Sequence, residues 1–243
     1  MHVSKGKVVG VVLGAGQGVR MQAPENKVFL PLGGVPMLAR ALRAFECEAS
    51  IDEVVLVGAP GELQRCRCQI VEAYHFRKVR RIVAGGPTRH DSEYAALQSL
   101  RGDIERGQIE VVLIHDGARP FLEPGILAKL VAMARAKGSA VIGLPLEPSE
   151  VVVLADAEGR IERQLCLGMA WRVQTPQAFA AQPLLRAYDR AAAEGFRGTD
   201  TASAMERAGE SIYMMHGSAR NIKITTPADL LHAEYLVLET PDF

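Results

Sequence analysis

The chain has 243 residues, of which 48% are hydrophobic, and its 28 Lys and Arg residues balance 28 Asp and Glu residues. This neutral balance gives no electrostatic support for binding to nucleic acid or to a membrane surface. The first residues, 1–7, are short and polar, and no apolar run reaches membrane-spanning length, so we expect a cytoplasmic protein without a signal peptide. The cysteines Cys47, Cys66, Cys68 and Cys166 match no standard zinc spacing. We expect a single domain over 1–243.

A glycine-rich loop follows the first apolar run, 8–13, which has the pattern of a strand buried on both faces. The loop carries Gly14, Gly16, Gly18, Arg20 and Lys27. Its spacing matches neither the dinucleotide fingerprint nor the Walker loop. Glycines let main-chain N–H groups approach a ligand closely, and cations bind phosphate. An ordinary strand-to-helix turn is the alternative for the glycines alone, whereas the two cations favour a phosphate-binding loop.

Strand and helix patterns alternate through the first half of the chain. We predict helices at 37–47 and 61–74 and strands at 53–57 and 81–84. Strands that alternate with helices favour a mostly parallel, twisted sheet with helices on both faces, which is a three-layer, Rossmann-like α/β sandwich.

A second glycine turn follows the strand at 81–84. The segment GGPTRHDS, residues 85–92, leads into a helical pattern of apolar residues. Arg89 and Ser92 lie near the start of this helix, where anions are favoured. Simple capping of the helix by Asp91 or Ser92 is the alternative.

The predicted strand at 110–114 is followed by HDGARP, residues 115–120. Ligands of open α/β sheets lie outside the carboxyl ends of strands, so Asp116 is well placed to hold Mg²⁺ or a ribose hydroxyl. A turn-capping aspartate is the alternative. His115 points to the opposite face of the strand from Asp116, and we expect it to be structural.

The pattern changes after the helix predicted at 124–137 and the strand at 140–144. Residues 145–171 hold two short β-like runs, at 151–154 and 160–165, joined by a turn at 156–159. We expect a protruding β-hairpin arm, and a second copy of the chain is its most economical partner. The segment 172–179 returns to the main body. Helices at 184–193 and 201–208, a strand at 212–215 and a last helix capped by Thr226 complete the pattern.

No Ser-His-Asp or Cys-His set is evident in the sequence. Cations after glycine loops, together with Asp116 and Asp200, suit phosphoryl or nucleotidyl transfer, in which positioning and charge neutralisation dominate. A phosphate monoester has a second pKa of about 6, so at neutral pH it is largely a dianion and needs no general base to act as a nucleophile. These residues therefore favour attack of a sugar phosphate on a nucleoside triphosphate.

Six motifs, taken together, resemble one enzyme family. They are LGAGQGVRMQAPENKVFLPLGGVPML, GGPTRHDS, HDGARP, QTPQAF, GTDTAS and NIKITTPADLLHAE. In this order they resemble the 2-C-methyl-D-erythritol 4-phosphate cytidylyltransferase family, one of the sugar-phosphate nucleotidyltransferases, over nearly the whole chain. The resemblance implies transfer of CMP from CTP to 2-C-methyl-D-erythritol 4-phosphate, with release of pyrophosphate, in the non-mevalonate isoprenoid pathway. It also implies Mg²⁺ and a homodimer with the arm at 145–171.

The resemblance assigns three groups of residues. The nucleotide-binding group is Gly14, Ala15, Gly16, Gly18, Gly86, Arg89, Ser92 and Asp116, with Asp116 also on the metal. The catalytic cations are Arg20, Lys27 and Lys223. The acceptor-binding group is Ser149, Thr175, Thr199 and Asp200, partly across the dimer.

Several positions on the acceptor side depart from the usual family pattern. Pro148 and Ser149 replace an Asp-Thr pair, Leu167 stands where an arginine is usual, and Arg220 replaces an acidic residue. Three interpretations follow. The usual acceptor is retained with a charge supplied by Arg163, Arg172 or Arg220, or the acceptor is another polyol phosphate such as ribitol 5-phosphate, or the chain binds nucleotide without catalysis. The retained cations favour an enzyme, with methylerythritol phosphate as the leading acceptor.

Overall fold

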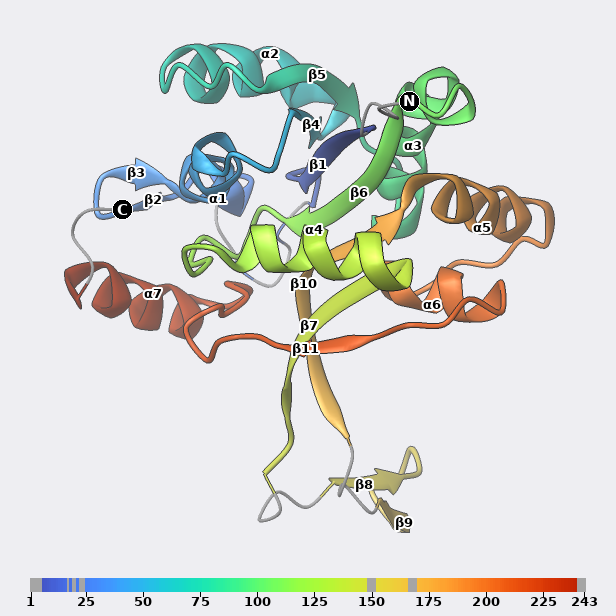
Figure 1. Ribbon diagram of the computed structural model, residues 1–243. Coiled ribbons are helices and arrows are strands. Elements are labelled where there is room, and N and C mark those ends of the chain that lie inside the picture. The colour runs from blue at the N-terminus through green and yellow to red at the C-terminus, as the bar shows by residue number, and fades with distance from the viewer. Residues whose placement is uncertain are drawn as a thin grey trace.

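The computed structural model describes residues 6–16, 18, 21, 25–147, 152–165 and 170–239. Its centre is a seven-stranded sheet in the order β11-β7-β10-β6-β1-β4-β5 (Figure 1). The strands are β1 (Lys7–Leu13), β4 (Glu53–Gly58), β5 (Val79–Ala84), β6 (Ile109–Asp116), β7 (Ser139–Pro145), β10 (Trp171–Ala180) and β11 (Met214–His216). Only β10 runs antiparallel to its neighbours in this sheet, and the other pairs are parallel. The mostly parallel sheet expected from the sequence is confirmed.

Helices cover both faces of the sheet. One face carries α1 (Met37–Cys47), the continuous stretch α2 (Leu63–Arg65) and η4 (Cys66–Glu72), and α4 (Ile126–Lys137). The other face carries α3 (Arg89–Glu105), α5 (Ala181–Ala193) and α6 (Thr201–Arg207). The helix predicted at 61–74 is a composite, since a 3-10 turn, η3 (Pro60–Glu62), precedes it and η4 is a π-helix.

The alternation of side chains along β1 explains the two hydrophobic cores. Val8 and Val12 belong to the core beneath α1 and α4, whereas Val9 and Val11 belong to the core beneath α3 and α5. Successive strand residues point to opposite faces, so an uninterrupted valine run requires cover on both sides. Gly10 leaves room for the Phe45 ring, which a Cβ at this position would meet at 2.5 Å.

The remaining elements lie beside this sandwich. A short η2 turn (Lys27–Phe29) leads to the small hairpin of β2 (Pro31–Leu32) and β3 (Val35–Pro36), and α7 (Pro227–Glu239) packs against β2. No helix among the described residues is long and apolar enough to cross a membrane.

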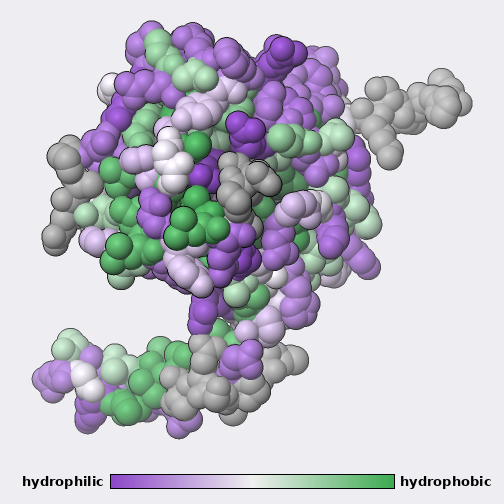
Figure 2. Space-filling model, turned by 90° about the vertical axis from the view of Figure 1, so that its left-hand side faces the viewer, coloured by the Kyte–Doolittle hydropathy of each residue, from purple (hydrophilic) through white to green (hydrophobic). Residues whose placement is uncertain are grey.

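The predicted hairpin forms a separate antiparallel pair, β8 (Val152–Ala155) and β9 (Ile161–Leu165). It stands away from the sandwich at the far ends of β7 and β10 (Figure 1). Figure 2 shows it set apart from the main body, with hydrophobic side chains along it. Val152, Val153, Leu154 and Ile161 are 37%, 37%, 43% and 63% exposed.

Candidate active site

The carboxyl ends of three parallel strands meet at one edge of the sheet. Leu13 at the end of β1 is paired with Val57 of β4 and with Asp116 of β6. Backbone bonds join the loops that follow, from Gly14 N to Val57 O at 2.7 Å and from Gly117 N to Leu13 O at 2.8 Å. This register places the glycine loop, the GGPT turn and Asp116 around one space.

That space is a cavity of about 680 Å³, called the first cavity below. Its lining comes from all three loops and from the segment before α7. The predicted residues in the lining are Ala15, Gly16, Gly18, Lys27, Gly86, Arg89, Ser92, Asp116 and Lys223. Gly14 does not belong to this lining. Its carbonyl accepts a hydrogen bond from Asn26 Nδ2 at 3.0 Å, and its N–H donates to Val57 O at 2.7 Å.

Asn26 fixes the glycine loop, and the sequence motif alone does not reveal this. Its side-chain nitrogen donates to Gly14 O and to Glu62 Oε2, at 3.0 and 2.8 Å, and its oxygen accepts from Val28 N. The neighbouring Lys27 is buried, and its Nζ donates to Ile224 O at 2.7 Å. Lys27 thereby ties the glycine loop to the segment that carries Lys223.

The GGPT turn is held by the start of α3. Thr88 is the N-cap, and with Asp91 it forms a capping box in which each side chain accepts from the other residue's backbone N–H. The helix cap is therefore Thr88, and Asp91 is its partner. The Ser92 hydroxyl accepts from Gly86 N at 3.1 Å and donates to Thr88 O at 2.9 Å, so it shapes the turn from within.

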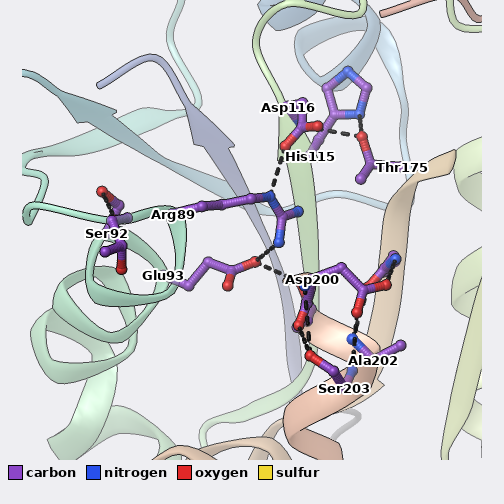
Figure 3. Close-up of polar contacts among 12 residues, drawn as sticks. Arg89, Ser92, Glu93, His115, Asp116, Thr175, Asp200, Ala202 and Ser203 are labelled. Carbon is purple, nitrogen blue, oxygen red and sulfur yellow. Dashed lines mark hydrogen bonds and ion pairs between the residues drawn. The ribbon is translucent and has the colours of Figure 1, made fainter. Parts of the chain in front are cut away.

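Asp116 is the electrostatic centre of the site (Figure 3). Arg89 Nε lies 3.0 Å from its Oδ1, while Lys223 Nζ and Arg119 Nε lie 2.7 and 3.9 Å from its Oδ2. Burial alone would raise the pKa of Asp116, but Arg89 and Lys223 hold it well below its usual range. The carboxylate is therefore ionised throughout the physiological range.

A second cavity, of about 550 Å³, opens on the other side of Asp116. Arg89, Asp116 and Lys223 line both cavities. The other lining residues are Arg119, Val173, Gln174, Thr175, Gln177, Thr199, Asp200, Ala202, Ser203 and Glu206. The predicted acceptor residues Thr175, Thr199 and Asp200 are thus brought together here. The residues that sequence reasoning missed are chiefly Arg119 and the two glutamines, although Arg119 lies within the HDGARP motif.

Thr175 and His115 form a buried hydrogen-bond chain that ends at the backbone of Asp116. The Thr175 hydroxyl accepts from Asp116 N and contacts His115 Nδ1, both at 3.1 Å, and His115 Nε2 contacts Arg119 O at 3.0 Å. Burial lowers the pKa of His115 to about 4. A neutral ring with Nε2–H satisfies both contacts, because Nε2 then donates to the carbonyl and Nδ1 accepts from the hydroxyl. His115 is structural, as the strand geometry predicted.

Asp200 serves two purposes. It is the N-cap of α6, where it accepts from Ser203 N at 3.0 Å, and it also accepts from Gln177 Nε2 at 2.9 Å. Its carboxylate lines the second cavity while its hydrogen bonds hold α6 against β10.

Several predicted positions lie outside the described residues, namely Arg20, Pro148, Ser149 and Leu167. Arg220 is described, and its Nη1 pairs with Glu239 Oε2 at 2.7 Å on α7. It belongs to neither cavity lining, so the described residues give no support for Arg220 as a substitute charge on the acceptor side.

The fold and site together define a class of protein. Glycine loops and cations lie at the carboxyl ends of parallel strands, and a second polar cavity shares the same charged residues. This arrangement is typical of an enzyme that transfers a group from a nucleotide to a polar acceptor.

Comparisons with known proteins identify the family. The family model described as "IspD: 2-C-methyl-D-erythritol 4-phosphate cytidylyltransferase" matches residues 8–239. A protein of that name from Geobacter metallireducens is 40% identical over 96% of this chain and 98% of its own length. One from Geobacillus kaustophilus is 40% identical over 93% and 95% of the two chains.

Solved structures agree with the sequence relatives. The 4-diphosphocytidyl-2C-methyl-D-erythritol synthase of Anaerococcus prevotii superposes with a TM-score of 0.81 at 27% identity, covering 96% of this chain and 97% of that one. The cytidylyltransferase of Thermus thermophilus gives 0.73 at 28% identity, covering 94% and 98%. The chain belongs to the 2-C-methyl-D-erythritol 4-phosphate cytidylyltransferase family. The expected family, fold and enzyme class are confirmed, as is the expected function of cytidylyl transfer in isoprenoid biosynthesis.

Proposed function

We propose that the first cavity binds CTP and the second binds 2-C-methyl-D-erythritol 4-phosphate, so that the reacting phosphates meet beside Asp116. The observation that carries this proposal is the sharing of Arg89, Asp116 and Lys223 by both cavities. A transfer reaction needs its two substrates to meet at one point, and these three residues form the boundary between the cavities.

The acceptor phosphate attacks the α-phosphorus of CTP. A new P–O bond forms to the acceptor, the bond from the α-phosphorus to the bridging oxygen breaks, and pyrophosphate leaves with that electron pair. The acceptor phosphate is largely a dianion at neutral pH and needs no proton removed. His115 is suited to no such task, because it is fully buried and both ring nitrogens are occupied.

The cations of the site stabilise the charge that develops during transfer. Lys27 borders the first cavity at the glycine loop, and Lys223 stands at the boundary between the cavities. The Lys223 side chain is 37% exposed and pairs with Asp116 in this structure, so it has freedom to turn toward a phosphate. Arg20, which the family resemblance assigns to the same task, lies outside the described residues.

We also propose that CTP is bound with Mg²⁺. Asp116 is the single carboxylate among the described residues that line the first cavity, and no cluster of three potential metal ligands occurs in the described part of the chain. Mg²⁺ is usually held by one or two carboxylates together with substrate phosphates. This donor set therefore fits an ion that arrives with the triphosphate, held by Asp116, where it would neutralise phosphate charge.

The arm is proposed to make a homodimer. The dimer is supported by the exposed apolar side chains of the arm, Val152, Val153, Leu154 and Ile161. An apolar two-stranded hairpin is at best marginally stable by itself in water. The single-domain organisation and the cytoplasmic location stay predictions from the sequence.

Release of pyrophosphate tests the function directly. Purified protein is supplied with CTP and Mg²⁺, and with 2-C-methyl-D-erythritol 4-phosphate or ribitol 5-phosphate in separate reactions. We expect release with the first acceptor. Release only with the second would assign the second cavity to another polyol phosphate. CTP binding without release in either reaction would favour a nucleotide-binding protein that has lost catalysis.

A further inference from the structure

We propose that Glu93 is a positioning residue, which sets the Arg89 guanidinium at the boundary of the two cavities and ties it to helix α6. The inference rests on the proposed assignment of the cavities to the two substrates. Glu93 itself lines neither cavity and is completely buried. Substrate affinity would thus depend on a carboxylate that touches neither substrate.

Arg89 is clamped between two carboxylates. Its Nε donates to Asp116 Oδ1 at 3.0 Å, and its Nη1 donates to Glu93 Oε1 at 2.5 Å. Figure 3 shows the guanidinium between these two acids. A guanidinium is planar, so two acceptors on different nitrogens fix its plane. The third nitrogen, Nη2, is buried and has no hydrogen-bond partner among the described residues.

Asp116 alone would hold Arg89 less firmly. That carboxylate is shared with Lys223 at 2.7 Å and Arg119 at 3.9 Å. Any movement of Lys223 toward a phosphate changes the charge around Asp116. Glu93 has no second cationic partner among the described ion pairs, so it gives Arg89 a fixed anchor on its own helix, one turn along α3.

Glu93 also reaches the acceptor side of the site. The hydroxyls of Thr201 and Tyr188 donate to its two oxygens, at 2.5 and 2.6 Å. Thr201 is the first residue of α6, directly after Asp200, which lines the second cavity. A single carboxylate therefore connects the arginine of both cavities with the helix that borders the acceptor cavity. Arg89, Thr201 and Tyr188 together also offset the free-energy cost of burying the Glu93 carboxylate.

A merely structural role is the competing account, because Glu93 joins α3 to α5 and α6. Asp189 of α5 is the control for this account, since it joins two of the same helices, although its side chain is 37% exposed where that of Glu93 is 1% exposed. Asp189 accepts from Tyr94 OH and Arg101 Nη1 of α3, at 2.8 and 3.0 Å, and lines neither cavity. Both carboxylates join the same two helices, but only Glu93 contacts Arg89.

The test compares Glu93→Gln with Asp189→Asn in the full chain. We measure the dissociation constant of CTP by calorimetry, the KM for each substrate, and the melting temperature. Glu93→Gln keeps the shape of the side chain but removes its charge. We expect both the CTP dissociation constant and the acceptor KM to rise by about 10-fold to 100-fold, which corresponds to about 1.4–2.7 kcal/mol, the scale of one hydrogen bond to a charged group. Asp189→Asn is expected to lower the melting temperature and leave these constants unchanged.

Two results would overturn the proposal. One is a folded Glu93→Gln protein with wild-type substrate constants, and the other is an equal rise in both variants. If Glu93→Gln does not fold, Thr201→Val removes only the hydroxyl between Glu93 and α6. It should then raise the acceptor KM more than the CTP dissociation constant, and unchanged constants would again overturn the proposal. CTP binding needs no turnover, so this comparison remains decisive even if the wild type fails to release pyrophosphate, which would count against the proposed function alone.

Discussion

Gly16 and Gly18 are two residues apart in the glycine loop, but the fold itself requires glycine only at Gly18. Gly18 has φ of +64°, in the left-handed region that side chains rarely adopt, and a Cβ there would also approach Lys27. The φ of Gly16 lies outside that left-handed region, and a Cβ added to it would meet nothing within 4 Å. The fold would therefore accept a side chain at Gly16. Because Gly16 lines the first cavity, the absence of a side chain there leaves more space in the cavity.

Gly16→Ala should weaken CTP binding without weakening the fold. We expect the dissociation constant of CTP to rise by about 10-fold, because a methyl group would stand where the loop backbone meets the nucleotide, and a factor of ten is about 1.4 kcal/mol. Calorimetry and thermal melting measure the two effects. Gly61→Ala is the matched control, since its Cβ also meets nothing and Gly61 does not line the cavity. Unchanged CTP affinity in Gly16→Ala would refute this use of the loop.

Lys27→Ala should reduce turnover. We expect kcat to fall by about 10²–10³, the usual scale for removing one preorganised charge contact at a transition state. Lys27 also holds Ile224 O at 2.7 Å, so a melting curve must accompany the kinetics. Lys27→Met keeps the length of the side chain without its charge and separates the two effects. Full turnover in a folded Lys27→Met protein would exclude a catalytic role for this lysine.

The buried His115 makes the fold sensitive to acid. Its folded pKa of about 4 lies below the unfolded value of 6.5, so protons bind the unfolded chain preferentially between these values. Stability contributed by the neutral ring is complete above pH 6.5 and is lost as the pH falls toward 4, to a total of about 3 kcal/mol at 1.36 kcal/mol per unit. Urea unfolding from pH 7.5 to 4 measures this loss. In His115→Gln, the free energy of unfolding should fall less steeply as the pH decreases. An equally steep fall in the wild type and the variant would show that His115 is not the source of the acid sensitivity.

At the scale of elements, the first cavity depends most on helix α3, whose first residues lie in its lining. Its capping box holds the GGPT turn, its first turn supplies Arg89 and Ser92, and its next turn supplies the anchor Glu93. The start of one helix therefore performs three tasks. Loss of its N-cap would alter the lining of the first cavity.

Thr88→Ala should destabilise the protein by about 1 kcal/mol, within the range of 0.5–2 kcal/mol for losing an N-cap. The Asp91 backbone N–H loses its acceptor, and Asp91 loses a hydroxyl donor. Chemical unfolding measures the difference. Gln98→Ala, at an exposed position of the same helix, is the control and should change the free energy of unfolding by less than about 0.5 kcal/mol. Equal effects of the two substitutions would exclude the capping role.

The elements were largely predictable because apolar spacing determines which faces are buried. The strands at 8–13 and 110–114 and the helix at 37–47 agree closely with β1, β6 and α1. The alternative for GGPTRHDS, in which Asp91 or Ser92 caps the helix, differs in part from the structure: Thr88 is the N-cap and Asp91 is its capping-box partner. Thr88, Asp91 and Ser92 are all good capping residues, and only the backbone conformation decides among them. The π-turns of η4 were also missed, because a wider turn has no distinct sequence pattern.

The site was predictable where motifs follow strands, and not where contacts join distant segments. The two glycine turns and HDGARP lie next to strand ends, so topology alone brings them together. Glu93 resembles an ordinary helix-surface glutamate in the sequence, and only the packing of Tyr188 and Thr201 reveals that it is buried. Lys27 and Ile224 are 197 residues apart, and no local pattern connects them.

At the scale of the whole molecule, the main body and the arm differ in how they bury their hydrophobic side chains. The sandwich covers both faces of its sheet, whereas the β8–β9 hairpin leaves Val152, Val153, Leu154 and Ile161 exposed. β8 pairs only with β9 among the described strands. Because β10 runs from the arm to the second cavity, where Gln174, Thr175 and Gln177 line the wall, a second copy covering the arm would also stabilise this strand.

Ile161→Glu should therefore convert the proposed dimer into monomers. Ile161 is 63% exposed, so a charge there costs little in the isolated chain but would be unfavourable within an apolar interface. Sedimentation velocity at several concentrations measures the change in mass, and we expect a shift of at least about 10-fold in the dimer dissociation constant. Glu162→Lys, on the adjacent residue, is the control and alters the charge of a position already polar. A wild-type monomer, or a dimer that Ile161→Glu leaves intact, would show that the arm does not hold two copies together.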